Sequence, residues 1–301
     1  MGGKDLSLGN YTPTWRLQRK LAHTAIQRSL RGDMEQIVQS QAQHLCKDMA
    51  SVEEIHNCMT ELVKTWSAVP IKLVDFLPIL RIFPNAKLKH LLSCVEIRDS
   101  LIQDQIDKYQ DSHHSAEAEN MVDHMLQFLN DHNISKRGET GLFPEHVHMA
   151  IIDLLVGGIE TTATLLTWTV AFLLHHPQIQ EEIHKEIMVV VGPHREPTYS
   201  DRKHLPYLNA IIWETLRMRP SAPLALPHMT IHDTRFLEGN AMAEAQRHLV
   251  PFSCGTRVCL GEALARMEAF LFLTYVLRDF QILPSLSGSL PSLQPHWVKT
   301  E

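Results

Sequence analysis

The chain has few of the residues that mark several protein classes. Only five of its 301 residues are cysteines, an odd number without the paired spacing of metal sites, which argues for a reducing compartment and against a disulfide framework. The formal net charge is −6, and without any long run of like charges nucleic acid is not an expected partner. The nineteen histidines form no zinc-finger spacing with the cysteines, which disfavours that kind of metal-binding module.

Targeting signals are also lacking. Residues 1–10 contain no apolar stretch of the kind found in signal peptides, so the sequence as given predicts neither a signal peptide nor a membrane anchor. The longest uncharged stretch, Thr161 to Gln180, is interrupted by threonines, histidines and a proline. We therefore expect a buried helix there, with a bilayer span as the alternative.

Helical periodicity is what the chain does have. Long windows free of proline and glycine, with few alternating β-branched runs, predict a mainly α protein, and 44% hydrophobic residues suffice for a sizeable core. Proline or aspartate opens several of the expected helices. These helices are Pro13 to Leu30, Asp33 to Met49, Val52 to Trp66, Asn85 to Tyr109, Glu119 to Asn130, Pro144 to His175, Pro177 to Val191, Leu205 to Met218 and Leu260 to Asp279.

Breaks between these helices are predicted from turn-like composition at residues 70–84, 131–141 and 192–200. Residues 220–251 differ, because they contain Pro220, Pro223 and Pro227 near their start and join two strong helices without a clear strand. A loop of that length inside a compact domain usually has a function or lacks a part.

Residues 252–261 read FSCGTRVCLG and come directly before an apolar-periodic helix. Cys259 lies where that helix begins, so unpaired N–H groups and the helix dipole favour its thiolate, the form that binds metal. Gly255 and Gly261 permit close approaches that a Cβ would block, as when a chain passes a flat macrocycle. Arg257 supplies a bidentate cation suited to a carboxylate such as a haem propionate. Considered alone, Cys259 could be a buried free cysteine.

The pattern FxxGxRxCxG before a helix resembles the cysteine-ligand loop of the cytochrome P-450 haem-thiolate monooxygenases. Three further stretches resemble motifs of that family, in the same order. Trp15 and Arg19 (WRLQR) resemble its WxxxR pair, although an exposed helical arginine is often only a solvated charge. Residues 157–162 (GGIETT) resemble its oxygen-activation groove. Glu214 and Arg217 (ETLR) resemble its ExxR pair, which shares one helix face.

The GGIETT stretch has physical requirements of its own. Two glycines inside a helix destabilise it by about 0.5 to 1 kcal/mol each, and a bulge that admits dioxygen would explain them. Thr161 can either bond back to the carbonyl of Gly157 or turn its hydroxyl toward a ligand. Glu160 is an acid in an otherwise apolar helix and hence a candidate proton relay, with Thr161 as its catalytic partner. The alternative is a helix kink for close packing with an exposed glutamate.

The family resemblance implies roles for further residues. Cys259 becomes the axial ligand of a haem b iron, and Arg98 a donor to the ring-A ketone of a steroid, although Arg98 could instead be a solvated charge on an amphipathic helix. Implied cofactor-binding residues are Trp15, Arg19, His228, Phe252, Arg257 and Cys259. Implied substrate-binding residues are Arg98, Asp153, Val156, Gly157, Ala222, Leu224 and Leu226, some of which core packing alone would explain. Implied structural residues are Glu214, Arg217 and Arg235.

The amino-acid sequence outside these motifs resembles that of the microsomal steroid hydroxylases of the family. The stretches HVHMA (146–150), LLHHP (173–177), PLALPH (223–228) and LPSLQP (290–295) carry this resemblance. It implies hydroxylation of progesterone or 17α-hydroxyprogesterone at C21, with electrons from NADPH-cytochrome reductase at the endoplasmic reticulum membrane. The thiolate of Cys259 would then supply electron density that favours cleavage of the O–O bond.

The chain also departs from the family pattern. Arg217 and Arg235 lie 18 positions apart, where the family has several strands and a further helix. We therefore expect residues 1–301 to form a single, incomplete cytochrome P-450 domain that lacks most of the family's small β-sheet. The alternative function is a truncated, catalytically inactive relative that still binds haem.

Overall fold

The structure is a computed structural model that describes residues 5–7, 9–47, 85–112, 121–135, 143–222, 251–285 and 288–294. The chain divides into two compact units, residues 1–47 with 120–301, and residues 48–119. In the second unit the described helix is α5 (Ala86–Ser112). The prediction of a single domain over 1–301 stays a prediction.

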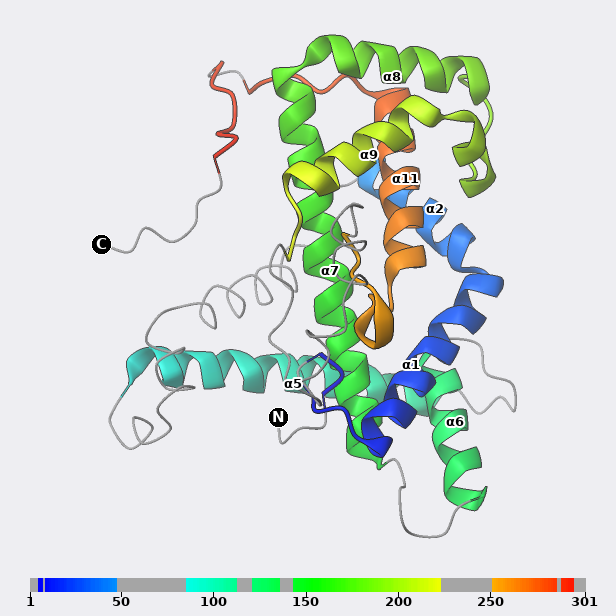
Figure 1. Ribbon diagram of the computed structural model, residues 1–301, viewed down its shortest axis with the longest axis vertical. Coiled ribbons are helices and arrows are strands. Elements are labelled where there is room, and N and C mark those ends of the chain that lie inside the picture. The colour runs from blue at the N-terminus through cyan, green and yellow to red at the C-terminus, as the bar shows by residue number, and fades with distance from the viewer. Residues whose placement is uncertain are drawn as a thin grey trace, which may run out of the picture. The chain divides into compact units, whose positions relative to one another are not determined.

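The first unit is built from helices, coloured from blue through green to red along the chain (Figure 1). They are α1 (Pro13–Arg31), α2 (Met34–Lys47), α6 (Met121–Ser135), α7 (Pro144–His175), α8 (Pro177–Val190), α9 (Pro206–Met218) and α11 (Glu262–Asp279). Two short 3-10 helices, η2 (Tyr199–His204) and η4 (Gly255–Arg257), lie between them. The described residues contain no strand, and the predicted mainly α fold is confirmed.

Helix boundaries follow the local signals that the sequence contains. Proline opens α1, α7, α8 and α9, because a missing N–H costs nothing in the first turn. Thr12 caps α1, and its hydroxyl oxygen accepts a hydrogen bond from the Trp15 N–H at 3.1 Å. The break at His176, between α7 and α8, lies before Pro177 as predicted.

Three boundary predictions need correction. The predicted break at 131–141 begins too early, since α6 continues to Ser135. The break at 192–200 ends too late, because Tyr199 already begins η2, which Asp201 caps through its side chain. Helix α11 begins at Glu262 instead of Leu260, since Leu260 and Gly261 form a turn. The predicted helix Val52 to Trp66 lies outside the described residues.

The core of the first unit lies where α7, α8, α9 and α11 meet, with α2 at its edge. Tyr275 and Phe270 of α11 are the largest fully buried side chains. Phe270 belongs to the same hydrophobic cluster as Ile183 and Leu208. Helix α7 is long and apolar enough over Glu145–His175 to cross a membrane, a test that core helices of soluble proteins also pass. Its later half contributes Leu165 and Leu173 to the core. The buried helix predicted over Thr161 to Gln180 is confirmed only in part, because the helix is interrupted at His176 and Thr161 and Thr167 are exposed.

Candidate functional site

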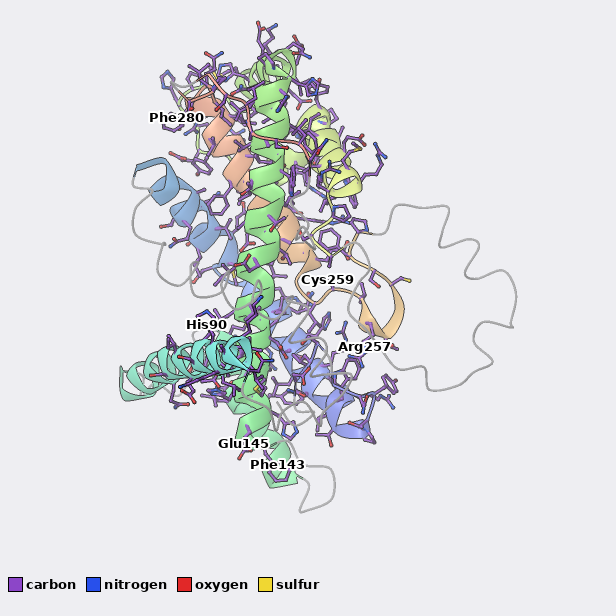
Figure 2. The ribbon with its side chains drawn as sticks, turned by 90° about the vertical axis from the view of Figure 1, so that its left-hand side faces the viewer. His90, Phe143, Glu145, Arg257, Cys259 and Phe280 are labelled. Carbon is purple, nitrogen blue, oxygen red and sulfur yellow. The ribbon has the colours of Figure 1, made fainter. Side chains whose placement is uncertain are left out.

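The loop before α11 is a closed turn that presents Cys259. The Cys259 N–H donates to the Phe252 carbonyl at 2.9 Å, and the Val258 N–H donates to the Gly255 carbonyl at 3.2 Å. Gly255 has φ +71°, a conformation that few other residues adopt without strain, which explains a glycine at this position. The loop lies at the level of the middle of α7 (Figure 1), and Figure 2, which labels Arg257 and Cys259 on it, shows that it projects to one side of that helix.

The thiol of Cys259 has a mixed environment. Burial among surrounding atoms raises its pKa, although the residue as a whole is exposed. The N–H groups of Gly261 and Glu262 and the charge of Arg19 act in the opposite direction but do not outweigh burial. The N–H groups at the start of the helix thus favour the thiolate as expected, but without a bound metal burial has the larger effect and the pKa is raised overall. A bound metal cation would lower the pKa of the Cys259 thiol and so stabilise the thiolate.

Trp15 brings two arginines to the same place. The guanidinium carbon of Arg257 lies 3.9 Å from the centroid of the Trp15 ring, and that of Arg19 lies 5.5 Å from it. Burial lowers the pKa of both arginines, and Arg257 lowers that of Arg19 further. The cluster is therefore a partly buried concentration of positive charge, which Asp5 offsets in part at Arg257.

Backbone carbonyls accept the hydrogen bonds of this cluster. Arg257 donates to Leu6 O at 3.2 Å and to Gly9 O at 2.6 Å, while Trp15 Nε1 donates to Leu6 O at 3.1 Å. Arg19 donates to the carbonyl of Val258, directly before Cys259. The contribution of Leu6 and Gly9 was not predicted, because their backbone atoms give no signal in the sequence pattern.

A cavity of about 690 Å³ opens next to this cluster. Trp15, Arg19, Val258 and Cys259 line it. Its other lining side chains include the cations Arg16, Lys20, Arg202 and Arg266. The positive lining makes the cavity suited to anionic groups.

The middle of α7 leaves open space beside its two glycines. A Cβ placed on Gly157 or Gly158 would meet no heavy atom of the described residues within 4 Å. The Thr161 hydroxyl donates back to the Gly157 carbonyl at 2.5 Å, which is the first of the two alternatives that the sequence left open. Glu160 is half-buried on the same stretch. Ser221 Oγ donates to the Thr161 carbonyl at 3.1 Å, and Ala222 is the next residue along the chain.

Asp153 binds the N-terminal segment instead of facing open space. Its two carboxylate oxygens accept hydrogen bonds from the Leu6 N–H at 2.6 Å and from Ser7 Oγ at 3.1 Å. Burial raises the pKa of Asp153 despite these bonds. The half-buried Val156 lies almost one helical turn further along α7. A substrate contact of Asp153 stays a prediction.

The remaining predicted residues are distributed as follows. Glu214 and Arg217 form a bidentate pair on α9, with Arg217 Nε to Glu214 Oε2 at 2.8 Å and a second bond at 2.6 Å. Both side chains are exposed, so the pair by itself adds little stability. Arg98 lies on α5 in the second unit, and its side chain lies outside the described residues. Outside the described residues lie also Leu224, Leu226, His228 and Arg235.

These residues fit a haem group on the chemistry of the donors. One thiol at the start of a helix can ligate iron, and the two arginines on Trp15 can bind carboxylates. Cβ atoms on Gly255 and Gly261 would meet no heavy atom of the described part within 4 Å, as on Gly157 and Gly158, so room exists for a flat group near the loop and near α7.

Known proteins are similar to this chain in sequence and in fold. A family model described as Cytochrome P-450 matches residues 51–239 and 234–299. Steroid 21-hydroxylase of Homo sapiens is 36% identical over 360 residues, covering 97% of this chain and 72% of that protein. The enzyme of the same name from Mus musculus is 34% identical over 355 residues, covering 97% of this chain and 73% of that protein.

A solved structure of a zebra fish cytochrome P-450 with progesterone superposes with a TM-score of 0.74 and 30% identity. The match covers 97% of this chain and 81% of the zebra fish chain. The fold, the four motifs and these similarities lead to one conclusion: the chain belongs to the cytochrome P-450 family of haem-dependent monooxygenases.

Proposed function

We propose that the chain is a haem-thiolate monooxygenase that hydroxylates C21 of progesterone or 17α-hydroxyprogesterone. The observation that carries this proposal is Cys259 at the start of α11, with Arg19 and Arg257 next to it on Trp15. Cys259 would be the axial ligand of a haem b iron. When bound, the haem supplies the activation of dioxygen and the insertion of one oxygen atom.

The arginines would change partners when haem binds. Arg257 now donates to the carbonyls of Leu6 and Gly9, and Arg19 to that of Val258. Bonds to an ionised carboxylate are stronger than bonds to a neutral carbonyl, so propionates would compete successfully for the guanidinium groups. In this proposal Trp15 and Phe252 lie beside the haem, and His228 binds a propionate.

Residues of α7 would handle protons and hold the substrate. The Thr161 hydroxyl would turn from the Gly157 carbonyl toward the open space beside Gly157 and Gly158, and Glu160 would supply it with protons. The substrate wall would include the glycine stretch and Ala222, which the bond of Ser221 to Thr161 brings close. Other proposed substrate contacts are Arg98, Asp153, Val156, Leu224 and Leu226.

The steroid substrate and the electron donor are proposed from the relatives and from charge. The relatives are named steroid 21-hydroxylases, and the zebra fish enzyme was solved with progesterone. The cations around the cavity beside Cys259 suit an acidic electron donor, which we take to be NADPH-cytochrome reductase at the endoplasmic reticulum membrane.

The test uses the full chain loaded with haem. We expect the reduced carbon monoxide complex to show the red-shifted Soret band of thiolate ligation, and progesterone to be converted when the reductase is added. Cys259→Ser should abolish both results, whereas Cys254→Ser, an exposed thiol in the same loop, should leave both unchanged. Absence of the red-shifted band from the wild-type chain would sink the proposal.

A second candidate is an inactive haem-binding relative. It is favoured by the alignment with the mouse enzyme, which extends over 355 positions although this chain has 301 residues, so the relative has internal segments without a counterpart here. This candidate predicts the red-shifted band without any conversion of progesterone. Detectable product that depends on the reductase would exclude it.

A further inference from the structure

Glu268 connects the two helices that carry the proposed chemistry. It lies on α11, nine positions after Cys259, and is half-buried. Its Oε2 accepts a hydrogen bond from Thr162 Oγ1 of α7 at 3.0 Å. Thr162 is buried and directly follows Thr161. Glu268 lies outside the motifs described above, and its bond to Thr162 is seen only in the structure.

The stretch of α7 that Glu268 contacts is locally weak. Two adjacent glycines lower helix stability there. The Thr161 hydroxyl also donates to the carbonyl of Gly157, a kind of bond that often bends helices. Side-chain bonds between residues 157–162 and other elements include that of Thr162 to Glu268 and that of Ser221 to the Thr161 carbonyl. Ser221 is exposed, whereas the Thr162 bond lies in the interface of α7 and α11. Of these two bonds, the one to Glu268 is better shielded from water.

We propose that Glu268 is a positioning residue that holds Thr162, and through it Thr161 and Glu160, in a fixed register relative to the helix that begins after Cys259. This inference rests on the proposed function, because it concerns the same oxygen-activation groove. A glutamate is suited to the task, since its length spans the gap between two helices and its oxygens accept hydrogen bonds in either protonation state. Burial raises the pKa of Glu268, in keeping with a side chain enclosed by the interface.

The role differs from simple packing in what it predicts. If Glu268 acts through the bond to Thr162, a substitution that keeps an acceptor oxygen should preserve the groove. If it acts only by filling space, any side chain of similar size should do so. Glu268→Gln and Glu268→Leu separate these two cases, and Thr162→Val removes the same bond from the other side.

Thr169→Val is the matched control. Thr169 is a buried threonine further along α7 whose hydroxyl also reaches another helix, with 3.3 Å between its oxygen and the Thr215 hydroxyl of α9. Its hydroxyl also donates to the Leu165 carbonyl of its own helix at 2.9 Å, so Thr169→Val removes a buried hydroxyl of α7 away from the groove. Its loss should therefore affect stability without affecting residues 157–162.

The first measurement is hydrogen–deuterium exchange of the full chain as purified, without added haem. We expect the amides of residues 158–163 to exchange about tenfold faster in Glu268→Leu and in Thr162→Val than in the wild type. Glu268→Gln and Thr169→Val should stay close to the wild type in this segment. Because Thr162→Val is nearly isosteric, it tests the proposal even if Glu268→Leu does not fold.

The second measurement is the C–O stretching band of the reduced carbon monoxide complex of the haem-loaded chain. It should shift or broaden in Glu268→Leu and Thr162→Val and return to the wild-type position in Glu268→Gln. Unchanged exchange in both bond-deleting variants, or equal acceleration in Thr169→Val, would overturn the proposal. A wild-type chain that gives no thiolate-type spectrum would count against the proposed function, while the exchange result would still decide the role of Glu268.

Discussion

Two adjacent residues of α7, Gly157 and Gly158, are costly for a helix, and no neighbour among the described residues explains them. No heavy atom of the described residues lies within 4 Å of a Cβ built on either one. A close packing contact within the described chain is therefore not the reason for their small size. The space beside them is what a bound group would use, as the proposed function requires.

Gly158→Ala should separate the stability of the chain from its function. Without haem, the variant should be more stable by about 0.5 to 1 kcal/mol, since alanine restricts the unfolded chain and meets no clash. After loading, it should hold less haem per chain, because the methyl group occupies the open space. Urea unfolding and the ratio of Soret to protein absorbance measure the two effects.

The control for this substitution is Gly192→Ala. Gly192 has φ +77°, so alanine there is strained and should lower the free energy of unfolding without changing haem content. If Gly158→Ala lowered stability as well, a packing role for Gly158 would replace the proposed ligand space.

The short helix η2 illustrates how one carboxylate organises an element. Asp201 accepts hydrogen bonds from the Thr198 N–H at 2.8 Å and from two nitrogens of Arg195, each at 2.9 Å. Burial raises the pKa of Asp201, but the bonds from Arg195 and Thr198 outweigh it, so the pKa is lowered overall. Because η2 packs against α11 and α9, this cap helps to set the edge of the core.

Asp201→Asn should lower the free energy of unfolding at neutral pH by about 1 to 2 kcal/mol. Most of this loss belongs to the capping bonds, because Arg195 is largely exposed and water weakens its ion pair. Since the folded pKa lies below the unfolded one, the contribution is present above the ordinary range of aspartate and is lost as pH falls through the folded value.

Urea unfolding between neutral and acidic pH measures this contribution in the wild type and in Asp201→Asn. The two curves should converge at low pH. Lys185→Gln, which removes exposed ion pairs to Glu181 and Glu182 on α8, should give no measurable change at any pH. A wild-type advantage that stayed constant with pH would contradict the assignment to ionised Asp201.

On the scale of the molecule, the sign of the local charge at the cavity is opposite to that of the net charge. The chain carries a formal net charge of −6, yet the cavity beside Cys259 is lined by several arginines and a lysine. Such a local excess attracts a partner of opposite sign and speeds its association. In the proposed function, this cavity is the docking position from which electrons would reach the Cys259 side of a haem.

Reversal of charge at Arg16 and Lys20 tests this docking position. The double variant Arg16→Glu, Lys20→Glu should lower reductase-supported turnover about tenfold at low ionic strength, with a smaller difference at high salt because salt screens the attraction. Its reduced carbon monoxide spectrum should match the wild type. Lys185→Glu, a cation that does not line the cavity, is the control. Equal loss of turnover at all salt concentrations would contradict an electrostatic role.

Local signals explain how far prediction could go. The start of α7 at Pro144 and its end before Pro177 were predicted correctly, because proline acts on its own neighbours. Trp15, Arg19, Arg257 and Cys259 were predicted as one cluster from motifs, and the structure brings them together. The effect of burial on the Cys259 thiol was not predicted, since burial depends on chain segments distant in sequence.

The helical class, the order of the motifs and the family can be read from the amino-acid sequence alone, since these depend on periodicity, on proline positions and on short fixed patterns. The partners that those residues bind are known only from the folded chain. The bonds of Arg257 to Leu6 and Gly9, of Asp153 to Leu6, and of Glu268 to Thr162 join positions more than 100 residues apart. Such bonds leave no local pattern, because each depends on how separate helices pack together.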